Sequence, residues 1–352
     1  MPHRDSRTGW AMGIAAGCVA LLLGPGCSES DSSAAGAGAN GAGASSGSTG
    51  GAGGSGGVLN VGGSAGDVDG SVGGTGGQAP VGCGNVVTGT VRDFHAGVDF
   101  QCNNSGFTDT YQKDCGPWDP AIVGALGSSL GSDQTPVYAS TDKTPSTTGA
   151  ADFSQWYHDT PGVNMTDALK LTMVAGQSGT FVYDEPFFFP IDGKLFAADP
   201  NDPDKDKYFS DDGKARNFHF TYELHTQFRY DPGNVFTFRG DDDVFVYINR
   251  KLAVNLGGIH VPLQGVINLD TGRVEITVPS EFQGQLPDLQ TAPEYGFDEK
   301  IPNGVAGTVQ LDLTPGQVYD MDFFFNERNC CASNFRVETN FVFVDCGQGP
   351  VK

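Results

Sequence analysis

Apolar and polar residues alternate along much of the chain after residue 83, which is the pattern of β-strands that bury one face. In 218–225 (FHFTYELH), for example, every second residue is large and apolar. The run 244–248 (VFVYI) is apolar on both faces, so we expect that strand to be buried on both sides. Helical periodicity is nearly absent, and turn-forming residues separate the runs. The pattern predicts an all-β domain, a β-sandwich or a barrel with long loops.

The expected strands, in chain order, are 86–94, 169–175, 179–183, 218–225, 235–239, 244–248, 252–254, 266–269, 273–278, 308–313, 318–325 and 335–344.

Three consecutive acids, Asp241, Asp242 and Asp243, stand directly before the buried run 244–248. Adjacent carboxylates repel one another and are costly to desolvate beside so apolar a strand. A hard cation with oxygen ligands neutralises them most simply, and Ca2+ suits carboxylates, amides and carbonyls. The alternative is a solvated acidic turn between two strands.

The first 27 residues have the layout of a signal peptide. Arg4 and Arg7 precede an apolar run at 10–23 that is too short for a comfortable membrane span. Cys27 follows small residues, as in a bacterial lipoprotein cleavage box, so we expect 1–27 to be a lipoprotein-type signal peptide with Cys27 lipidated. Ordinary secretion with cleavage nearby is the alternative.

The remaining chain divides by composition. Residues 28–82 are rich in Gly, Ala and Ser and hold almost no large apolar residue, so they predict a disordered tether with an r.m.s. reach of roughly 40 Å. We expect one folded domain at 83–346 and a short tail at 347–352. Ser28 directly after the lipidated cysteine favours the outer membrane, so the predicted location is the cell surface.

The chain is strongly acidic, with 42 Asp and Glu residues against 20 Lys and Arg residues and a net charge of −22. Nucleic acids and anionic lipid surfaces would repel it, so neither is an expected partner; the membrane contact we expect is the lipid anchor. The charge agrees with cation binding.

The cysteines indicate an exported, oxidised domain, because six of the eight lie after residue 82 and disulfides form outside the cytoplasm. Six cysteines allow fifteen connectivities. Cys83 and Cys346 bracket the domain as a terminal staple would, and Cys102–Cys115 would close a short loop. Our hypothesis for Cys330–Cys331 is a vicinal bridge.

Six segments carry a resemblance to a known family. They are GTVRDF at 89–94, QWYHDTPGVN at 155–164, FFFPIDG at 187–193, NFHFTYELHTQFRY at 217–230, FTFRGDDDVFVYINRKLAVNLGGIH at 236–260 and FFFNERNCCASNFRVET at 323–339. In this order, over about residues 86–345, they resemble a fibro-slime domain. That domain is similar to the β-sandwich of anthrax protective antigen and of yeast flocculins, many of which are lectin-like adhesion modules. The resemblance therefore implies a β-sandwich.

The resemblance also implies a ligand set. In those relatives two adjacent aspartates, joined by a cis peptide, hold Ca2+ that binds sugar hydroxyls, and a second loop adds Asn and backbone carbonyls. The pair falls on Asp241 and Asp242, and Asp243 takes a position often occupied by Gly. Asn255 stands where an Asp is usual. The second loop is 326–334, with Asn329 and Asn334 as its ligands.

Two other patterns favour different chemistry. Gly127-Ser128-Ser129-Leu130-Gly131 fits the GxSxG nucleophile elbow of esterases, which requires a strand, a turn and a helix. Asp202, Asp204 and Asp206 have EF-hand spacing, but Lys207 stands where that loop needs Gly, so we expect a solvated acidic loop. For Glu327 and Arg328 we expect a structural ion pair.

These expectations combine into a cell-surface lipoprotein, not an enzyme, that binds Ca2+ and through it carbohydrate or matrix polysaccharide as an adhesion module. The first alternative is a structural matrix protein in which Ca2+ only braces the fold. A secreted esterase that uses Ser129 is the third hypothesis.

Overall fold

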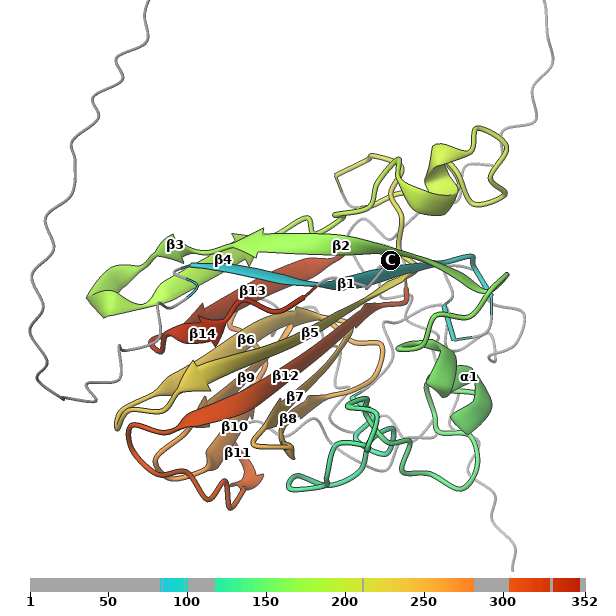
Figure 1. The fold of residues 1–352 in the computed structure, drawn as a ribbon. Helices are drawn as coiled ribbons and strands as arrows, with labels where there is room; N and C mark the ends of the chain where they lie inside the picture. The colour runs from blue at the N-terminus through green and yellow to red at the C-terminus, as the bar shows by residue number, and fades with distance from the viewer. Residues whose placement is uncertain are drawn as a thin grey trace, which may run out of the picture. The chain divides into compact units, whose positions relative to one another are not determined.

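Antiparallel strands pair into two sheets that pack face to face as a β-sandwich (Figure 1). The computed structural model describes residues 83, 85–97, 99–100, 118–210, 212–281, 304–329 and 332–348. The predicted fold class is confirmed. No helix in these ranges has the length and apolar character needed to cross a membrane.

The first sheet contains, in spatial order, β2 (Asn164–Thr172), β1 (Val86–Phe94), β5 (Phe220–Arg229), β12 (Val318–Glu327), β7 (Asp243–Ile248) and β8 (Lys251–Leu256), with β14 (Phe343–Asp345) paired to β5. The second sheet contains β11 (Gly304–Thr308), β10 (Arg273–Thr277), β9 (Leu263–Asn268), β6 (Val235–Asp241), β13 (Asn334–Thr339), β4 (Phe181–Glu185) and β3 (Val174–Ala175). The described helices are α1 (Ala150–Gln155) and the short 3-10 helices η1 (Gln177–Gly179) and η2 (Leu195–Ala198).

Most predicted strands shift by a few residues at their ends, and three differ more, because they are divided or are mostly not strand. The predicted strand 169–175 is divided between β2 in one sheet and β3 in the other, and 335–344 is divided between β13 and β14. Most of 308–313 is not a strand, although Val309 and Leu311 are buried. An apolar pattern records burial, and burial does not require strand pairing.

Both faces of the first sheet are covered by apolar side chains. Val244 and Val246 of β7 belong to the main core between the sheets, while Phe245 and Tyr247 belong to a second cluster on the other side of the same strand. Trp156, directly after α1, is part of that second cluster, and Figure 1 shows α1 and the green loops before it on that side. The prediction that 244–248 is buried on both sides is confirmed.

Two of the connections between the sheets lie next to each other. β6 ends at Asp241 and β7 begins at Asp243, so the single residue Asp242 connects these two strands of different sheets. Likewise β12 in the first sheet leads to β13 in the second. The register places Asp243 opposite Asn326 and Asp241 opposite Asn334. Both crossings therefore lie at the same end of the sandwich.

Gly240 permits this crossing. A Cβ atom at this position would overlap the backbone carbonyl oxygen of Asn334 on β13 and press on the ring of Phe238. Only a residue without a side chain allows β6 and β13 to approach this closely.

A disulfide joins Cys83 to Cys346, with the two Cα atoms 5.1 Å apart, and confirms the predicted terminal bridge. The Cys83 N–H also donates to the carbonyl oxygen of Phe343 at 2.9 Å. The other predicted positions, Cys27, Cys102, Cys115, Cys330 and Cys331, lie outside the described residues.

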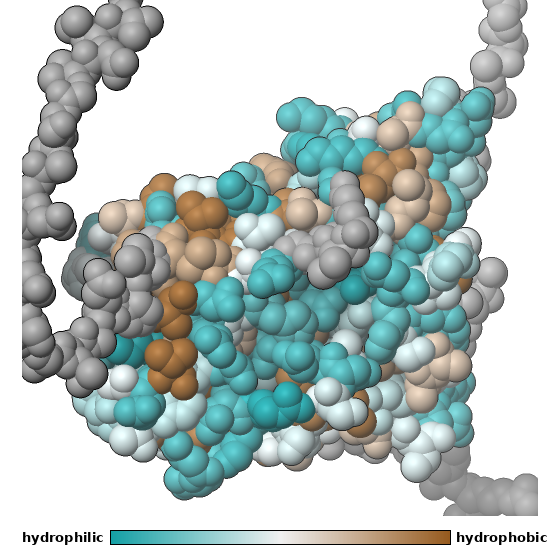
Figure 2. Space-filling view, viewed as in Figure 1, coloured by the Kyte–Doolittle hydropathy of each residue, from teal (hydrophilic) through white to brown (hydrophobic). Residues whose placement is uncertain are grey.

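The surface is mainly polar on the face drawn in Figure 2, with apolar residues gathered in small patches. The exposed large apolar side chains of the described ranges are Val137, Met165, Val174, Phe187, Phe209, Val305, Val318 and Val342.

Candidate functional site

The crossing from β6 to β7 holds the three acids that the sequence singles out. The peptide bond between Asp241 and Asp242 is cis, as the resemblance implies. Asp241 and Asp242 are 5% and 4% exposed, and Asp243 is fully buried. These carboxyl groups are therefore not in a solvated turn, and that alternative is wrong.

Asp241 is held by the strand beside it. Because β6 and β13 pair at this register, the Asn334 N–H donates to Asp241 Oδ1 at 2.5 Å. The Asn334 side-chain Nδ2 lies 3.4 Å from Asp241 Oδ2. The first acid and the second predicted loop are thus in direct contact.

Among the described residues, Asp242 accepts two long backbone hydrogen bonds, from the N–H groups of His260 and Arg328, each at 3.2 Å. Burial raises the pKa of this carboxyl group well above its ordinary value. The positive charge of Arg328 opposes that rise, and repulsion from Asp241 and Asp243 adds to it. The carboxyl group lies in a place where a negative charge is poorly compensated.

Glu327 adds a further buried acid that the sequence reasoning missed. It is the last residue of β12 and is fully buried. Its Oε1 accepts from the Asn329 N–H at 3.3 Å, whereas its Oε2 has no hydrogen-bond partner in the described part of the chain. Burial, then the charges of Asp242 and Asp241, raise its pKa well above the ordinary value. The expected pair of Glu327 with Arg328 is wrong, because Arg328 turns to another acid.

Arg328 pairs instead with Asp243. Its Nε and Nη2 donate to the two oxygens of Asp243 at 2.6 and 3.1 Å, and the Gly258 N–H donates to Asp243 Oδ1 at 2.6 Å. Both residues are fully buried. Because both oxygens accept hydrogen bonds from these donors, the contacts explain Asp243 as part of the protein framework rather than as a metal ligand.

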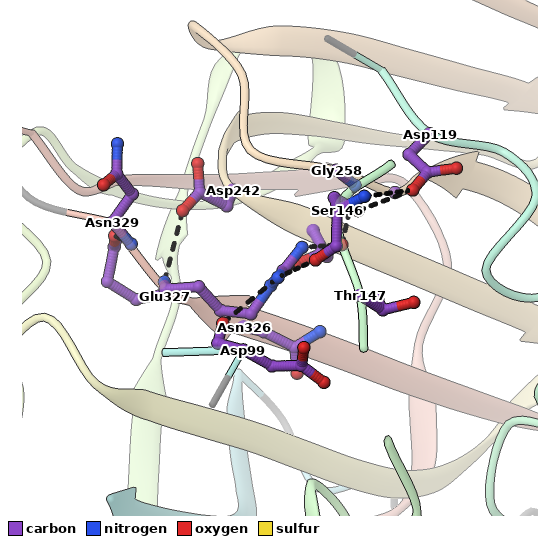
Figure 3. A network of polar contacts seen from close by, with 12 residues as sticks. Asp99, Asp119, Ser146, Thr147, Asp242, Gly258, Asn326, Glu327 and Asn329 are labelled. Atoms are coloured by element: carbon purple, nitrogen blue, oxygen red, sulfur yellow. Dashed lines mark hydrogen bonds and ion pairs between the residues drawn. The ribbon is translucent and has the colours of Figure 1, made fainter. Parts of the chain in front are cut away.

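The same arginine ties several loops to the crossing. Its Nη1 donates to the backbone oxygens of Asp99 and Ser146 at 3.1 and 2.7 Å, and its guanidinium stacks over the Trp156 ring at 4.6 Å. Ser146 in turn donates its N–H and hydroxyl to Asp119 Oδ2 at 3.0 and 2.6 Å. Figure 3 shows this network running from Asp242 through the centre of the view to Ser146 and Asp119.

Asn255 has a structural role that differs from the predicted one. Its Nδ2 donates to the backbone oxygens of Pro120 and Gly124 at 3.2 and 2.9 Å, and its Oδ1 accepts from the Gly257 N–H at 3.1 Å. The first two contacts hold the loop 119–124 against β8, and the third holds the backbone directly after β8. These contacts explain Asn255 as a structural residue rather than as a ligand.

Asn329 and Asn334, the remaining predicted ligands, are half-buried residues at the two sides of the second crossing. The Asn329 N–H contacts Glu327, and Figure 3 labels Asn329, Glu327 and Asp242 in one view. The site thus brings together Asp241, Asp242, Glu327, Asn329 and Asn334.

This donor set fits Ca2+. The side-chain acceptors are carboxylate and amide oxygens, the acids repel one another, and a buried Glu327 oxygen has no partner among the described residues. A bound cation would supply the positive charge that these acids need, since Arg328 is engaged by Asp243.

The other motifs have plain outcomes. Ser129 lies in a segment of turns and forms an isolated bridge with Lys251, so the strand, turn and helix of a nucleophile elbow do not occur there. The acidic loop that holds Asp202, Asp204 and Asp206, called the insert below, was expected to be solvated, but it is only partly so. The side chains of Asp202 and Asp204 are only 5% and 16% exposed and face His95. Asp206 is exposed.

The chain is similar to several proteins of Dictyostelium discoideum. It is 35% identical to protein psiR over 218 residues, which is 61% of this chain and 18% of psiR. It is 34% identical to protein psiQ over 223 residues (62% of this chain, 18% of psiQ) and 30% identical to protein psiD over 228 residues (63% and 36%). The match thus spans between 18% and 36% of the length of these relatives. No family model and no solved structure matches the chain.

Proposed function

We propose that the folded domain is a non-catalytic, Ca2+-dependent module of the fibro-slime type that binds glycans or matrix polysaccharide at the cell surface. The observation that carries the proposal is the group of buried acids Asp241, Asp242 and Glu327, which act on one another's charge while a Glu327 oxygen has no partner among the described residues.

The two crossings would hold the ion together. Asp241 and Asp242 come from the first crossing, and Glu327, Asn329 and Asn334 come from the second. Bound there, Ca2+ would neutralise the acids and offer coordination positions to the hydroxyl groups of a sugar. The side chains of Asn329 and Asn334 are half-buried, so they are the ones that reach solvent and contact a ligand.

The alternative is that Ca2+ only braces a structural matrix protein. Full burial of Glu327 and near-full burial of Asp242 favour it, because an enclosed ion has fewer positions left for a ligand. The two candidates agree on the ion and differ on the glycan.

One pair of experiments separates them. Calorimetric titration of the protein with Ca2+ is expected to show one site of millimolar to submillimolar affinity, on the order of 10⁻⁴–10⁻³ M as in extracellular modules. Asp242→Asn should lose it, whereas Asp231→Asn, at an exposed acid 51% accessible, should keep it. A glycan array with and without chelator then tests the ligand: chelator-sensitive binding supports the lectin module. Ca2+ uptake with a blank array supports the brace, and no uptake by the parent protein rejects both.

The anchoring of the module is proposed from the sequence. Lipid on Cys27 would hold the domain at the outer membrane through the tether 28–82. Cys27→Ala is expected to move the protein from the membrane fraction to the soluble fraction, and equal partitioning of both forms would exclude a lipid anchor at this position.

A further inference from the structure

A second group of possible metal ligands lies where the acidic insert folds back on the end of β1. His95 directly follows β1, and its Nδ1 is 3.5 Å from Asp202 Oδ2 and 3.5 Å from Asp204 Oδ2. One ligand atom from each of these three residues lies within 4.8 Å of the others. In Figure 1 the insert is the yellow-green segment after β4.

The side chains in this group are oriented by the backbone. The Ala96 N–H donates to Asp204 Oδ2 at 2.7 Å, and the Asp204 N–H donates to Asp202 Oδ1 at 2.8 Å. The Phe196 ring packs on the His95 ring with centroids 4.0 Å apart. Such contacts fix the direction of a ligand before an ion arrives. Lys207 Nζ is 3.9 Å from Asp204 Oδ1, the oxygen other than the one that faces His95.

Independent evidence for a ligand comes from the cavity beside this group. The cavity has a volume of about 90 Å³ and is lined by His95, Asp202 and Asp204 together with His219. His219 is 2% exposed, and its Nε2 has no hydrogen-bond partner in the ranges that the structure describes. A buried imidazole nitrogen that lines a cavity without a partner needs a water or an ion there.

The histidine of the acidic group also lacks a hydrogen bond. His95 Nδ1 is buried as an atom and has no partner of acceptable geometry among the described residues, although two carboxylate oxygens are 3.5 Å away. A simple ion pair would bring the nitrogen and an oxygen to ~2.7–2.9 Å. By contrast, ligands at ~2.0 Å from a tetrahedral ion lie ~3.3 Å from each other.

We propose that His95, Asp202 and Asp204 bind a divalent transition-metal ion of the Zn2+ class, with the cavity in front of His219 left for a water or a further ligand. The imidazole decides the class, since Ca2+ and Mg2+ take oxygen ligands whereas Zn2+ takes nitrogen together with carboxylate oxygen. The site is separate from the acids at the sheet crossing and does not depend on the function proposed for them.

The test is titration of the full chain with Zn2+ by calorimetry, supported by the visible absorption of bound Co2+. The parent protein is expected to bind at this site, and His95→Gln and Asp204→Asn should each weaken that binding by at least about tenfold. Asp199→Asn is the matched control, because it removes one charge from an exposed side chain of the same insert, away from the cavity. Asp242→Asn is the control for the other acidic site. Both controls should bind as the parent does.

Three outcomes would overturn the proposal: no Zn2+ uptake by the parent protein, equal uptake by His95→Gln and the parent, or equal loss in Asp199→Asn and Asp204→Asn. The last would mean that Zn2+ responds only to the charge of the insert. Thermal melting of each variant without metal controls for folding, and a variant that melts early is replaced by Asp202→Asn, which alters another ligand of the same group.

Discussion

Two groups of acids, at the sheet crossing and in the insert, bring carboxylates close together in different environments. At the sheet crossing, Asp241, Asp242 and Glu327 are nearly or fully buried on rigid strand ends. In the insert, Asp202 and Asp204 belong to a surface loop and converge on His95, which is 39% exposed. The insert brings its ligand atoms within 4.8 Å of one another, whereas the described acids of the crossing do not form such a group.

Burial of the acids and convergence of the ligand atoms are therefore separate properties of a metal site. At the crossing, backbone N–H groups of Asn334, His260 and Arg328 hold the acids apart, and their charges remain poorly compensated. An ion bound there would compete with these N–H groups for the oxygens. In the insert, the backbone turns the acids toward a common point at the edge of a cavity. Removing charge should therefore act on stability at the crossing and on metal affinity in the insert.

The largest effect on stability is expected at Asp243, which lies at the same crossing but is paired with Arg328. Asp243→Ala leaves the fully buried Arg328 without its carboxylate, and breaking one side of a buried pair costs roughly 3–5 kcal/mol of unfolding free energy. Denaturant unfolding measures the loss, which should be the same with and without Ca2+.

Asp242→Asn is the comparison for this variant, since it changes the neighbouring acid without breaking an ion pair. A loss as large as that of Asp243→Ala would show that the two acids have the same structural role and would erase the distinction drawn from their contacts.

Substitution of Glu327 is expected to raise the unfolding free energy rather than lower it. Glu327→Gln replaces the buried carboxyl group by a neutral amide of the same shape, so it should stabilise the Ca2+-free protein by relieving the repulsion from Asp242 and Asp241. The same variant should weaken Ca2+ binding. Unfolding and titration of one sample check both, and destabilisation of the Ca2+-free protein would mean that the charge is already compensated.

The sequence predicts the features that are local in the chain and not those that depend on distant contacts. The strand pattern and the three consecutive acids are local features, so the sandwich, the buried strand β7 and the pair Asp241–Asp242 could be predicted. The partners of those acids are separated by up to about a hundred residues in the chain, such as Arg328 for Asp243. Nothing local distinguishes the acid that meets an arginine from the acid beside it.

Glu327 and the insert show the other limit. A glutamate at the end of the apolar strand β12 is a weak signal, and its significance comes only from Asp241 and Asp242 across the crossing. His95 and Asp204 are more than a hundred positions apart, and their meeting depends on how the insert folds over β1. Spacing alone favoured a solvated loop, because spacing carries no information about the histidine.

A moderate effect should separate the two groups by metal. Ca2+ is expected to raise the melting temperature of the parent protein and of Asp202→Asn, but not that of Asp242→Asn, because binding to the folded state stabilises it by mass action. At ten times the dissociation constant the gain is about 1.4 kcal/mol, which for a domain of this size is a rise of roughly 3–6 °C. Scanning calorimetry decides; loss of the rise in Asp202→Asn would place Ca2+ in the insert.

The smallest effect on stability is expected at another pair of acids, Asp322 and Glu223, which are neutralised by the imidazole of His225. His225 on β5 lies between Asp322 and Glu223, with Nδ1 2.7 Å from Asp322 Oδ1 and Nε2 2.8 Å from Glu223 Oε1. Burial tends to lower the pKa of His225, but the hydrogen bonds and charges of Asp322 and Glu223 raise it to about 9. Arg92 also contacts Glu223. These acids therefore need no metal.

The sign of the pH dependence follows from that raised pKa. The protonated ring stabilises the fold fully below its unfolded pKa of ~6.5, and this contribution is lost as the pH rises through about 9. Because the side chain is 36% exposed, solvent screening limits the contribution to under about 1 kcal/mol. Melting temperatures between pH 6.5 and 9 should fall in the parent protein more steeply than in His225→Gln. Parallel curves would mean that the imidazole of His225 does not neutralise Asp322 and Glu223.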